Sequence, residues 1–398
     1  MPDFFTEAEQ LFEYTRSFRR DFHMHPELGF TEVRTAGIVA NELNALDMEV
    51  TTGVARTGVV GMLEGVAPGP VVLVRFDMDA LPVTEETGAD YASIVPGVMH
   101  ACGHDGHTAI GLTVAKLLHA HRDQLAGSVK FVFQPAEEGT CGQEIGGNEM
   151  MIREGVLENP EPDLALALHL WNEKPLGWVH IGGGPVMAGA EHFKITITGK
   201  GGHAAMPQQS VDPLLAASQI VNTLQSIISR NIDPLATAVV SVTMMHAGDT
   251  FNVIPSQAKL EGTIRTFDLA VREKVLKRFG ELVNGVTGAM GCAADVEVIR
   301  LTPALVNDND IASSVQETAN RLLPDAELET SGYLTMGAED MAFMLEKVPG
   351  CYFFVGSANQ EKGLSYGHHH PKFDFDEAAL PRAAALMATT VAEFLRMG

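Results

Sequence analysis

Three continuous runs of hydrophobic residues recur along the first half of the chain. They read VVLVRF at 71–76, VKFVFQ at 129–134 and LALALHL at 164–170. Because these runs do not alternate with polar residues, they are typical of strands buried on both faces, as in a mainly parallel sheet. Helical patterns lie between them, for example at 107–121, and another covers 5–22. This alternation predicts an α/β sheet domain.

The pattern changes at about residue 189. The sequence HFKITITG at 192–199 alternates as a half-exposed strand does. The expected elements that follow are a helix over 212–230, strands near 237–246 and 257–266, a helix capped by Asp268, and a strand over 295–301. The order β-α-β-β-α-β is that of a ferredoxin-like split βαβ unit.

Buried-strand patterns return after this segment, for example CYFFVG at 351–356. We therefore expect a discontinuous, mainly parallel mixed-sheet domain made of residues 1–188 and 304–398. A smaller α+β domain, residues 189–303, is inserted into it. Both are of ordinary domain size.

The composition limits what the chain binds. Of 398 residues, 27 are Lys or Arg and 51 are Asp or Glu, which gives a net charge of −24. A field of that sign repels nucleic acid and anionic membrane surfaces, so we expect neither as a partner. The hydrophobic runs are too short to span a bilayer, and the N-terminus has no signal-peptide core. The cysteines are widely spaced, and we expect a cytoplasmic protein without disulfides.

Side chains that bind metals follow or end each hydrophobic run. The first run is followed by Asp77 and Asp79, the second by Glu137 and Glu138, and the third contains His169. In open α/β sheets, ligands bind beyond the carboxyl ends of the strands. These side chains are therefore expected to meet at one site.

A further metal-type element lies just before a predicted helix. Cys102 and His104 flank a single glycine, and a thiolate beside an imidazole suits zinc and related divalent metals. The alternative is an ordinary glycine-rich turn with Asp105 as a helix cap. Together with the strand ends, the pattern favours the metal. We also expect at least one ligand among the three histidines at 368–370.

The adjacent carboxylates of Glu137 and Glu138 repel each other unless a cation lies nearby. A metal resolves the repulsion if one carboxylate ligates it while the other exchanges a proton, as the attack of water on a carbonyl requires. The alternative is a solvated helix N-terminus, which also favours acids. We expect Asp79 to support a ligating imidazole through a hydrogen bond.

The inserted segment contributes further candidates for substrate binding. His203 lies in the sequence GGHAA, whose small neighbours leave its imidazole accessible. Asn252 and Arg265 are candidates for binding a substrate carboxylate. A buried turn amide and a surface salt bridge are equally sensible interpretations of these two residues.

Motifs along nearly the whole chain resemble those of a known family. They are FHMHPELGFTE (22–32), RFDMDALPVTEETG (75–88), MHACGHDGHTA (99–109), FQPAEEG (133–139), GKGGHAAMP (199–207), FNVIP (251–255), MGAEDMAF (336–343) and HHHPKFDFDE (368–377). In kind and order they resemble the aminoacylase and carboxypeptidase-type metallopeptidase superfamily. Within it they are most similar to the amidohydrolase branch of hippurate hydrolases, N-acetyl-amino-acid deacetylases and auxin-conjugate hydrolases. The resemblance implies a zinc-exopeptidase-like catalytic domain with an inserted lid or dimerisation domain.

The resemblance also implies a cofactor and a set of roles. We expect two divalent metal ions per subunit, zinc or manganese, with cobalt and nickel not excluded. The implied ligands are Cys102, His104, Glu138, His169 and His369. Glu137 is implied as the general base, His203 as a residue that binds the substrate carbonyl or its oxyanion, and the inserted domain as the interface of a homodimer.

The chain differs from the family pattern at two positions. His368 stands where members often have Leu, directly before the ligand histidine. Gln208 stands where members often have His, after the AAMP sequence. The second difference bears on substrate preference rather than on the type of reaction.

These features predict a metal-dependent amidohydrolase that cleaves N-acyl amino acids, with acetyl, benzoyl or similar acyl groups, into a carboxylic acid and a free amino acid. Glu137 would take a proton from the attacking water and return it to the leaving amine. One alternative is a dipeptidase or carboxypeptidase with the same site. Others are a cysteine hydrolase with Cys102 as nucleophile and a non-catalytic protein that binds metal or acyl amino acids. Chelation, alkylation and a substrate panel would distinguish them.

Overall fold

The structure is a computed structural model that describes residues 2–139 and 145–396. The chain forms two compact units. The larger unit comprises Met1–Gly184, Val306–Tyr333 and Asp340–Gly398, and the smaller unit comprises Pro185–Leu305 and Leu334–Glu339. The predicted insertion, 189–303, lies within the smaller unit. The segment Leu334–Glu339, which groups with it, was not anticipated.

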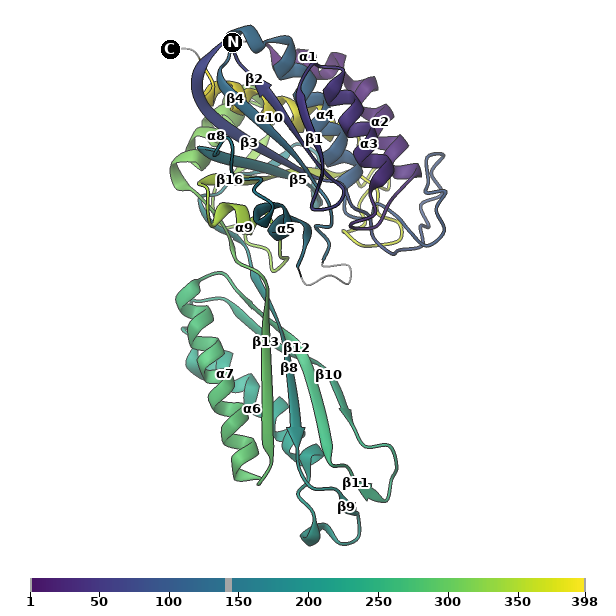
Figure 1. Ribbon diagram of the computed structural model, residues 1–398, viewed down its shortest axis with the longest axis vertical. Helices are drawn as coiled ribbons and strands as arrows, with labels where there is room; N and C mark the ends of the chain where they lie inside the picture. Colours follow the sequence, from purple (N-terminus) through teal and green to yellow (C-terminus); the bar gives the residue numbers. More distant parts are fainter. Residues whose placement is uncertain (1, 140–144, 397–398) are drawn as a thin grey trace. The chain divides into compact units, whose positions relative to one another are not determined.

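Within the described residues, the larger unit is built on an eight-stranded sheet in the order β1-β2-β4-β3-β5-β16-β6-β15. Its strands are β1 (Glu49–Val54), β2 (Gly58–Glu64), β3 (Ala67–Asp77), β4 (Ala126–Gln134), β5 (Leu164–Pro175), β6 (Trp178–His180), β15 (Glu327–Glu329) and β16 (Gly350–Ala358). Its helices are α1 (Phe4–Gln10), α2 (Phe12–Met24), α3 (Val33–Asn44), α4 (His104–Ala120), α5 (Gly147–Arg153), α8 (Asn309–Leu322), α9 (Ala342–Leu345) and α10 (Ala379–Phe394). Figure 1 shows α1, α2 and α3 gathered on one side of this sheet.

The central strands are the hydrophobic runs seen in the sequence. β4 and β5 both pair with β3 in parallel, and β16 pairs with β5 in parallel. All nine residues of β16 are buried, as are the first nine residues of β5. The prediction of an α/β fold with a mainly parallel central sheet is confirmed.

Two helices are buried almost all around. Most residues of α4 and α10 are buried because each packs on the sheet while α2 and α1, respectively, cover the other side. A helix in that position needs hydrophobic residues on every face. The first predicted helix, 5–22, is instead two helices that meet at Leu11, although the Leu11 N–H still donates to the Glu7 carbonyl at 3.0 Å.

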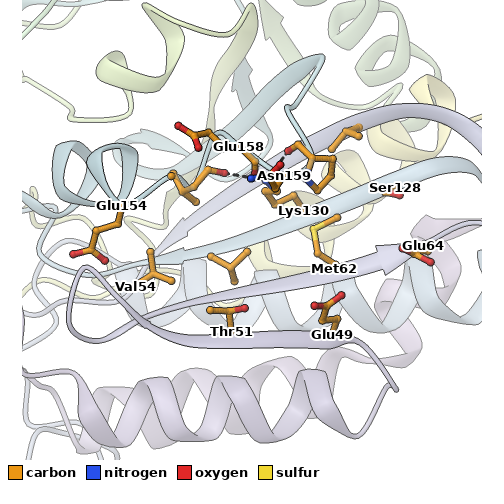
Figure 2. A pocket seen from close by; sticks show the side chains of 15 residues that line it. Glu49, Thr51, Val54, Met62, Glu64, Ser128, Lys130, Glu154, Glu158 and Asn159 are labelled. Atoms are coloured by element: carbon orange, nitrogen blue, oxygen red, sulfur yellow. Dashed lines mark hydrogen bonds between the residues drawn. The ribbon is translucent and has the colours of Figure 1, made fainter.

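One part of the sheet is open to solvent. A pocket of about 470 Å³ lies over β1, β2 and β4 and is closed on one side by residues 154–160 (Figure 2). The ammonium group of Lys130 donates hydrogen bonds to the carbonyls of Val156, Glu158 and Pro160 at 2.7–3.0 Å. These bonds hold the 154–160 loop against β4.

The smaller unit has the topology expected for a split βαβ fold. Its elements are β8 (Gly189–Thr198), α6 (Pro213–Asn231), β10 (Ala238–Ala247), β12 (Gln257–Thr266), α7 (Leu269–Ala289) and β13 (Ala293–Thr302). The strands form an antiparallel sheet in the order β10-β12-β8-β13, and both helices cover one face of it (Figure 1). Asp212 and Asp268 cap the two helices by accepting backbone N–H groups.

No helix of the described residues is both long and apolar enough to cross a bilayer.

Candidate metal centre

The loop before α4 places Cys102 and His104 beside the carboxyl ends of the central strands. Gly103, between them, has a φ of +94°, a left-handed conformation that glycine adopts without strain. His104 is the first residue of α4, and the His107 N–H donates to the Gly103 carbonyl at 3.0 Å to begin the helix. Both candidate ligands are buried.

Asp79 fixes the orientation of His104. The Nδ1 atom of His104 lies 3.0 Å from the Asp79 carbonyl oxygen and 3.1 Å from Asp79 Oδ1, so Nδ1 carries the proton. In the neutral ring the lone pair would then be on Nε2, which is buried and has no hydrogen-bond partner among the described residues. The other oxygen of Asp79 accepts the Glu138 N–H at 3.0 Å, which links the two candidate ligands through one carboxylate.

A second pair of bonds positions His169 on β5. His169 donates from Nδ1 to the Leu170 carbonyl at 2.7 Å, which leaves its Nε2 lone pair 3.5 Å from Cys102 Sγ. His107 binds Asp77 at 2.7 Å through Nδ1 and accepts the Leu170 N–H at 2.9 Å through Nε2. Because both of its nitrogens have partners, His107 holds the strand that carries His169 rather than offering a free lone pair.

Glu137 and Glu138 reach the same place from the end of β4. Glu138 Oε1 is buried without a hydrogen-bond partner among the described residues, and Oε2 lies 3.3 Å from His369 Nε2. The His369 N–H donates to the Ala101 carbonyl at 2.7 Å, which brings the histidine segment beside Cys102. Glu137 Oε2 lies 3.9 Å from His104 Nε2.

The described part of the chain holds five groups of donor atoms that lie within 4.8 Å of one another. Three of them contain only the predicted ligands and Glu137, and these are Cys102–His104–His169, Cys102–Glu138–His369 and His104–Glu137–Glu138. The other two are Asp77–His104–His107 and Glu137–Glu339–Asp340. Cys102 belongs to two of them. Thiolate, imidazole and carboxylate donors with unused lone pairs fit a divalent cation of the zinc type.

The electrostatics of the cluster favour the same interpretation. Burial, together with the carboxylates of Glu138 and Glu137, raises the pKa of Cys102 well above its usual value, so the thiol stays protonated unless a cation lies beside it. Burial keeps the pKa of His169 well below its usual value, which leaves a neutral imidazole. Burial would also lower the pKa of His104, but Asp77 and Asp79 reverse that effect and raise it to about 10, so a cation that binds Nε2 would have to replace a proton there.

The structure distinguishes the neighbouring histidines 368 and 369. His368 Nε2 accepts the Asn172 N–H at 3.2 Å, and its Nδ1 lies 3.9 Å from Cys102 Sγ. His369, and not His368, belongs to a group of converging donor atoms in the described chain.

The candidates in the smaller unit are not all brought together. His203 pairs with Val253 between β9 (Gly202–His203) and β11 (Val253–Ile254), and the Ala204 N–H donates to the Asn252 carbonyl at 3.1 Å. His203 and Asn252 are both exposed. Arg265 lies at the far end of β12, opposite Ala190, so it is separated from them by the length of the strand. The roles of all three in substrate binding stay predictions.

Several supporting residues were not singled out from the sequence. Asp105 is not a simple helix cap: its carboxylate lies 2.9 Å from Arg19 Nε and 2.8 Å from His23 Nδ1. Arg19 also binds Asp374, which anchors the segment after the histidines to α2 and α4. Nothing in the local pattern separates these residues from surface charges, because each partner is remote in sequence.

The comparisons with known proteins agree with this geometry. Residues 73–393 match the model of peptidase family M20/M25/M40. The chain belongs to this family. It is 39% identical to an N-acetylcysteine deacetylase of Bacillus subtilis over 94% of both chains, and 37% identical to thermostable carboxypeptidase 1 of Saccharolobus solfataricus over 98% of this chain and 97% of that one.

Among solved structures, the M20 chain is similar to the YXEP protein of Bacillus subtilis, described as a dinuclear metal-binding peptidase. The identity is 34% and the TM-score 0.84, covering 97% of this chain and 99% of the other. Membership of the family makes the chain a metal-dependent hydrolase that acts on amide bonds. The predicted family and enzyme class are confirmed.

Proposed function

We propose that the chain hydrolyses the amide bond of N-acyl amino acids and that Cys102, His104, Glu138, His169 and His369 hold two divalent cations. The single observation that carries the proposal is the convergence of these donor atoms, with His104 Nε2 and Glu138 Oε1 buried and without a hydrogen-bond partner in the described part of the chain. Leaving such groups buried without a partner is costly, and a cation removes that cost.

Two ions, rather than one, are supported by the arrangement of the groups. Cys102 is shared by a group with two histidines and a group with Glu138 and His369. The two groups would then each hold one cation. The YXEP protein, described as dinuclear, gives independent support. Zinc and manganese are the metals we propose to test first.

Glu137 is the proposed general base. When bound, the cations supply Lewis-acid polarisation of the scissile carbonyl and favour ionisation of the attacking water. Glu137 takes the proton of that water and delivers it to the nitrogen of the leaving amino acid. It adjoins Glu138 in the chain, and its Oε2 atom lies 3.9 Å from His104 Nε2, so its carboxylate converges with two of the proposed ligands.

The substrate class is supported by the relatives. The Bacillus subtilis relative is named for deacetylation of N-acetylcysteine, an N-acyl amino acid. We propose that His203 binds the substrate carbonyl, that Asn252 and Arg265 bind the carboxylate of the substrate, and that the smaller unit forms the interface of a homodimer. Hydrolysis of peptides is the second candidate, because the Saccharolobus solfataricus relative is named a carboxypeptidase.

A substrate panel tests the proposal. Acetyl-, benzoyl- and indoleacetyl-amino acids are compared with dipeptides by kcat/KM, using protein of known metal content. We expect acylated amino acids to be preferred, and a preference for dipeptides would favour the second candidate. Cys102→Ala protein is expected to lose metal as well as activity. If it kept its metal and lost only activity, Cys102 would be a nucleophile instead.

A further inference from the structure

The turn that carries Glu137 contains a strained residue. Ala136 has a φ of +48° and is fully buried. A residue with a Cβ atom adopts this left-handed conformation only at a cost in conformational free energy. The conformation is kept where contacts with the surrounding structure hold the residue in it. Because Ala136 directly precedes Glu137, its backbone conformation decides where the Glu137 and Glu138 side chains point.

Glu32 holds this turn from a segment that is remote in sequence. Its Oε1 atom accepts the Ala136 N–H at 2.9 Å, and its Oε2 atom accepts the Thr57 hydroxyl hydrogen at 2.6 Å. Glu32 is fully buried, just before α3. Burying a carboxylate costs free energy, and the Thr57 hydroxyl and the Ala136 N–H both donate to this one.

The turn is fixed from two other directions. The Ala136 carbonyl accepts the Gly147 N–H at 3.1 Å, and a Cβ atom on Gly147 would lie 1.6 Å from the Pro135 carbonyl, so only glycine fits. Asp79 Oδ2 accepts the Glu138 N–H. Two buried carboxylates thus bind alternate N–H groups of the turn, that of Ala136 and that of Glu138.

We propose that Glu32 is a positioning residue of the hydrolase, which holds Ala136 in its left-handed conformation and thereby aims Glu137 and Glu138. This inference rests on the roles proposed above for those two glutamates. Loss of the Glu32 acceptor lets Ala136 relax toward negative φ, which turns the base and one ligand away from the other donors.

The chain contains a matched control for this hydrogen bond between a glutamate and a left-handed alanine. Ala55, in the turn between β1 and β2, is also buried, has a φ of +49°, and donates its N–H to Glu154 Oε2 at 2.6 Å. Glu154 lines the open pocket of Figure 2 and belongs to none of the converging donor groups. The same bond to a left-handed alanine is therefore present without a neighbouring ligand.

The test compares Gln and Met at Glu32, with Met at Glu154 as the control. Glu32→Gln keeps an oxygen that accepts the Ala136 N–H, whereas Glu32→Met has a similar size and no acceptor. We expect Glu32→Met to lower kcat and to weaken cobalt binding, measured by competition with a chromophoric chelator, by about tenfold to a hundredfold each, the usual effect of losing a supporting hydrogen bond at a metal site. Glu32→Gln is expected to stay within about threefold of the parent in both measurements, since the bond persists. Glu154→Met is expected to change neither.

A second substitution separates positioning from general loss of structure. Glycine adopts positive φ without strain, so the Glu32→Met, Ala136→Gly double variant is expected to recover part of the lost kcat and cobalt affinity. If Glu32→Met does not fold, Glu32→Asp, whose carboxylate is too short to keep the bond, takes its place in the comparison. The inference would be overturned if Glu32→Gln lowered kcat and cobalt affinity as much as Glu32→Met or Glu32→Asp does. It would also be overturned if Ala136→Gly restored neither quantity. Glu137→Gln is measured in the same assays as a separate test of the proposed base. If this variant kept its kcat, Glu137 would not be the general base, whatever the result for the Glu32 variants.

Discussion

The two units present their candidate residues in opposite ways. In the larger unit, Asp79 fixes His104, the Leu170 carbonyl fixes His169, and the atoms left over converge in the interior. In the smaller unit, His203 accepts only the Ala205 N–H at its side chain among the printed contacts, and its ring is exposed. The first arrangement is complete within its own unit. In the smaller unit, the exposed His203 needs a substrate to bind before it can take part in the reaction.

This difference indicates that metal binding and substrate recognition are assigned to different units. A preorganised set of buried donors suits metal binding and proton transfer, which require fixed geometry. Exposed side chains on a separate unit suit the recognition of a substrate that enters and leaves. The comparison makes distinct predictions for the two units: substitutions in the larger unit should change metal content or chemistry, and those in the smaller unit should change neither metal content nor stability.

The largest expected effect is that of Glu137→Gln. The variant should retain its metal and lose kcat by about 10²–10⁴-fold, because a general acid–base group is removed. Glu138→Gln should instead lose metal. Metal analysis and steady-state kinetics on the two proteins check this. The reverse pattern would exchange the assignments of base and ligand.

His203→Ala should lower kcat by about 10²–10³-fold, the usual contribution of one oxyanion donor, with unchanged metal content. His246→Ala, another exposed histidine of the smaller unit, is the control and should match the parent. If His203 acts across a dimer, mixing Glu137→Gln with His203→Ala protein should restore part of the activity. An unaltered kcat in His203→Ala would remove this residue from the mechanism.

Asp79→Asn should weaken metal binding by about tenfold to a hundredfold, since the carboxylate that orients His104 and binds the Glu138 N–H is lost. The matched control is Asp163→Asn, because Asp163 accepts the Val71 N–H of the same strand, β3, at 2.8 Å but belongs to no converging group of the described chain. Equal metal affinities in the two variants would contradict the proposed role of Asp79.

The smallest expected effect is that of His368→Leu, which introduces the residue that family members often carry. In the parent chain, His368 Nε2 accepts the Asn172 N–H, and its Nδ1 atom lies near Cys102 Sγ. We therefore expect kcat to change by less than about tenfold and metal to be retained. His369→Leu should lose metal. If His368→Leu lost metal and His369→Leu did not, His368 and not His369 would be the ligand.

The sequence predicted the parts of the site that lie at the ends of hydrophobic runs. Asp79, Glu138 and His169 follow or lie in strands whose burial is evident from composition alone, and Gly103 brings Cys102 and His104 to the same edge of the sheet. The cap Asp268 and the β-α-β-β-α-β order of the smaller unit likewise follow from local patterns.

Residues that act through remote partners could not be predicted. Glu32 and Ala136 are about a hundred positions apart, and neither a glutamate before a helix nor an alanine after a proline signals a strained turn. The ion pair of Arg19 with Asp105 is hidden for the same reason. The break at Leu11 is a single residue in an otherwise continuous helical pattern, which hydrophobic periodicity does not resolve.

The central claim is that the buried donors of the larger unit bind the cations on which amide hydrolysis depends. The most direct test is to remove metal with a chelator and to titrate zinc or manganese back while bound metal and hydrolysis of N-acetyl amino acids are measured on the same samples. The account predicts negligible hydrolysis without metal and recovery in proportion to occupancy, up to about two ions per chain. Full hydrolysis in protein shown to be metal-free, or binding of metal without any recovery, would contradict it.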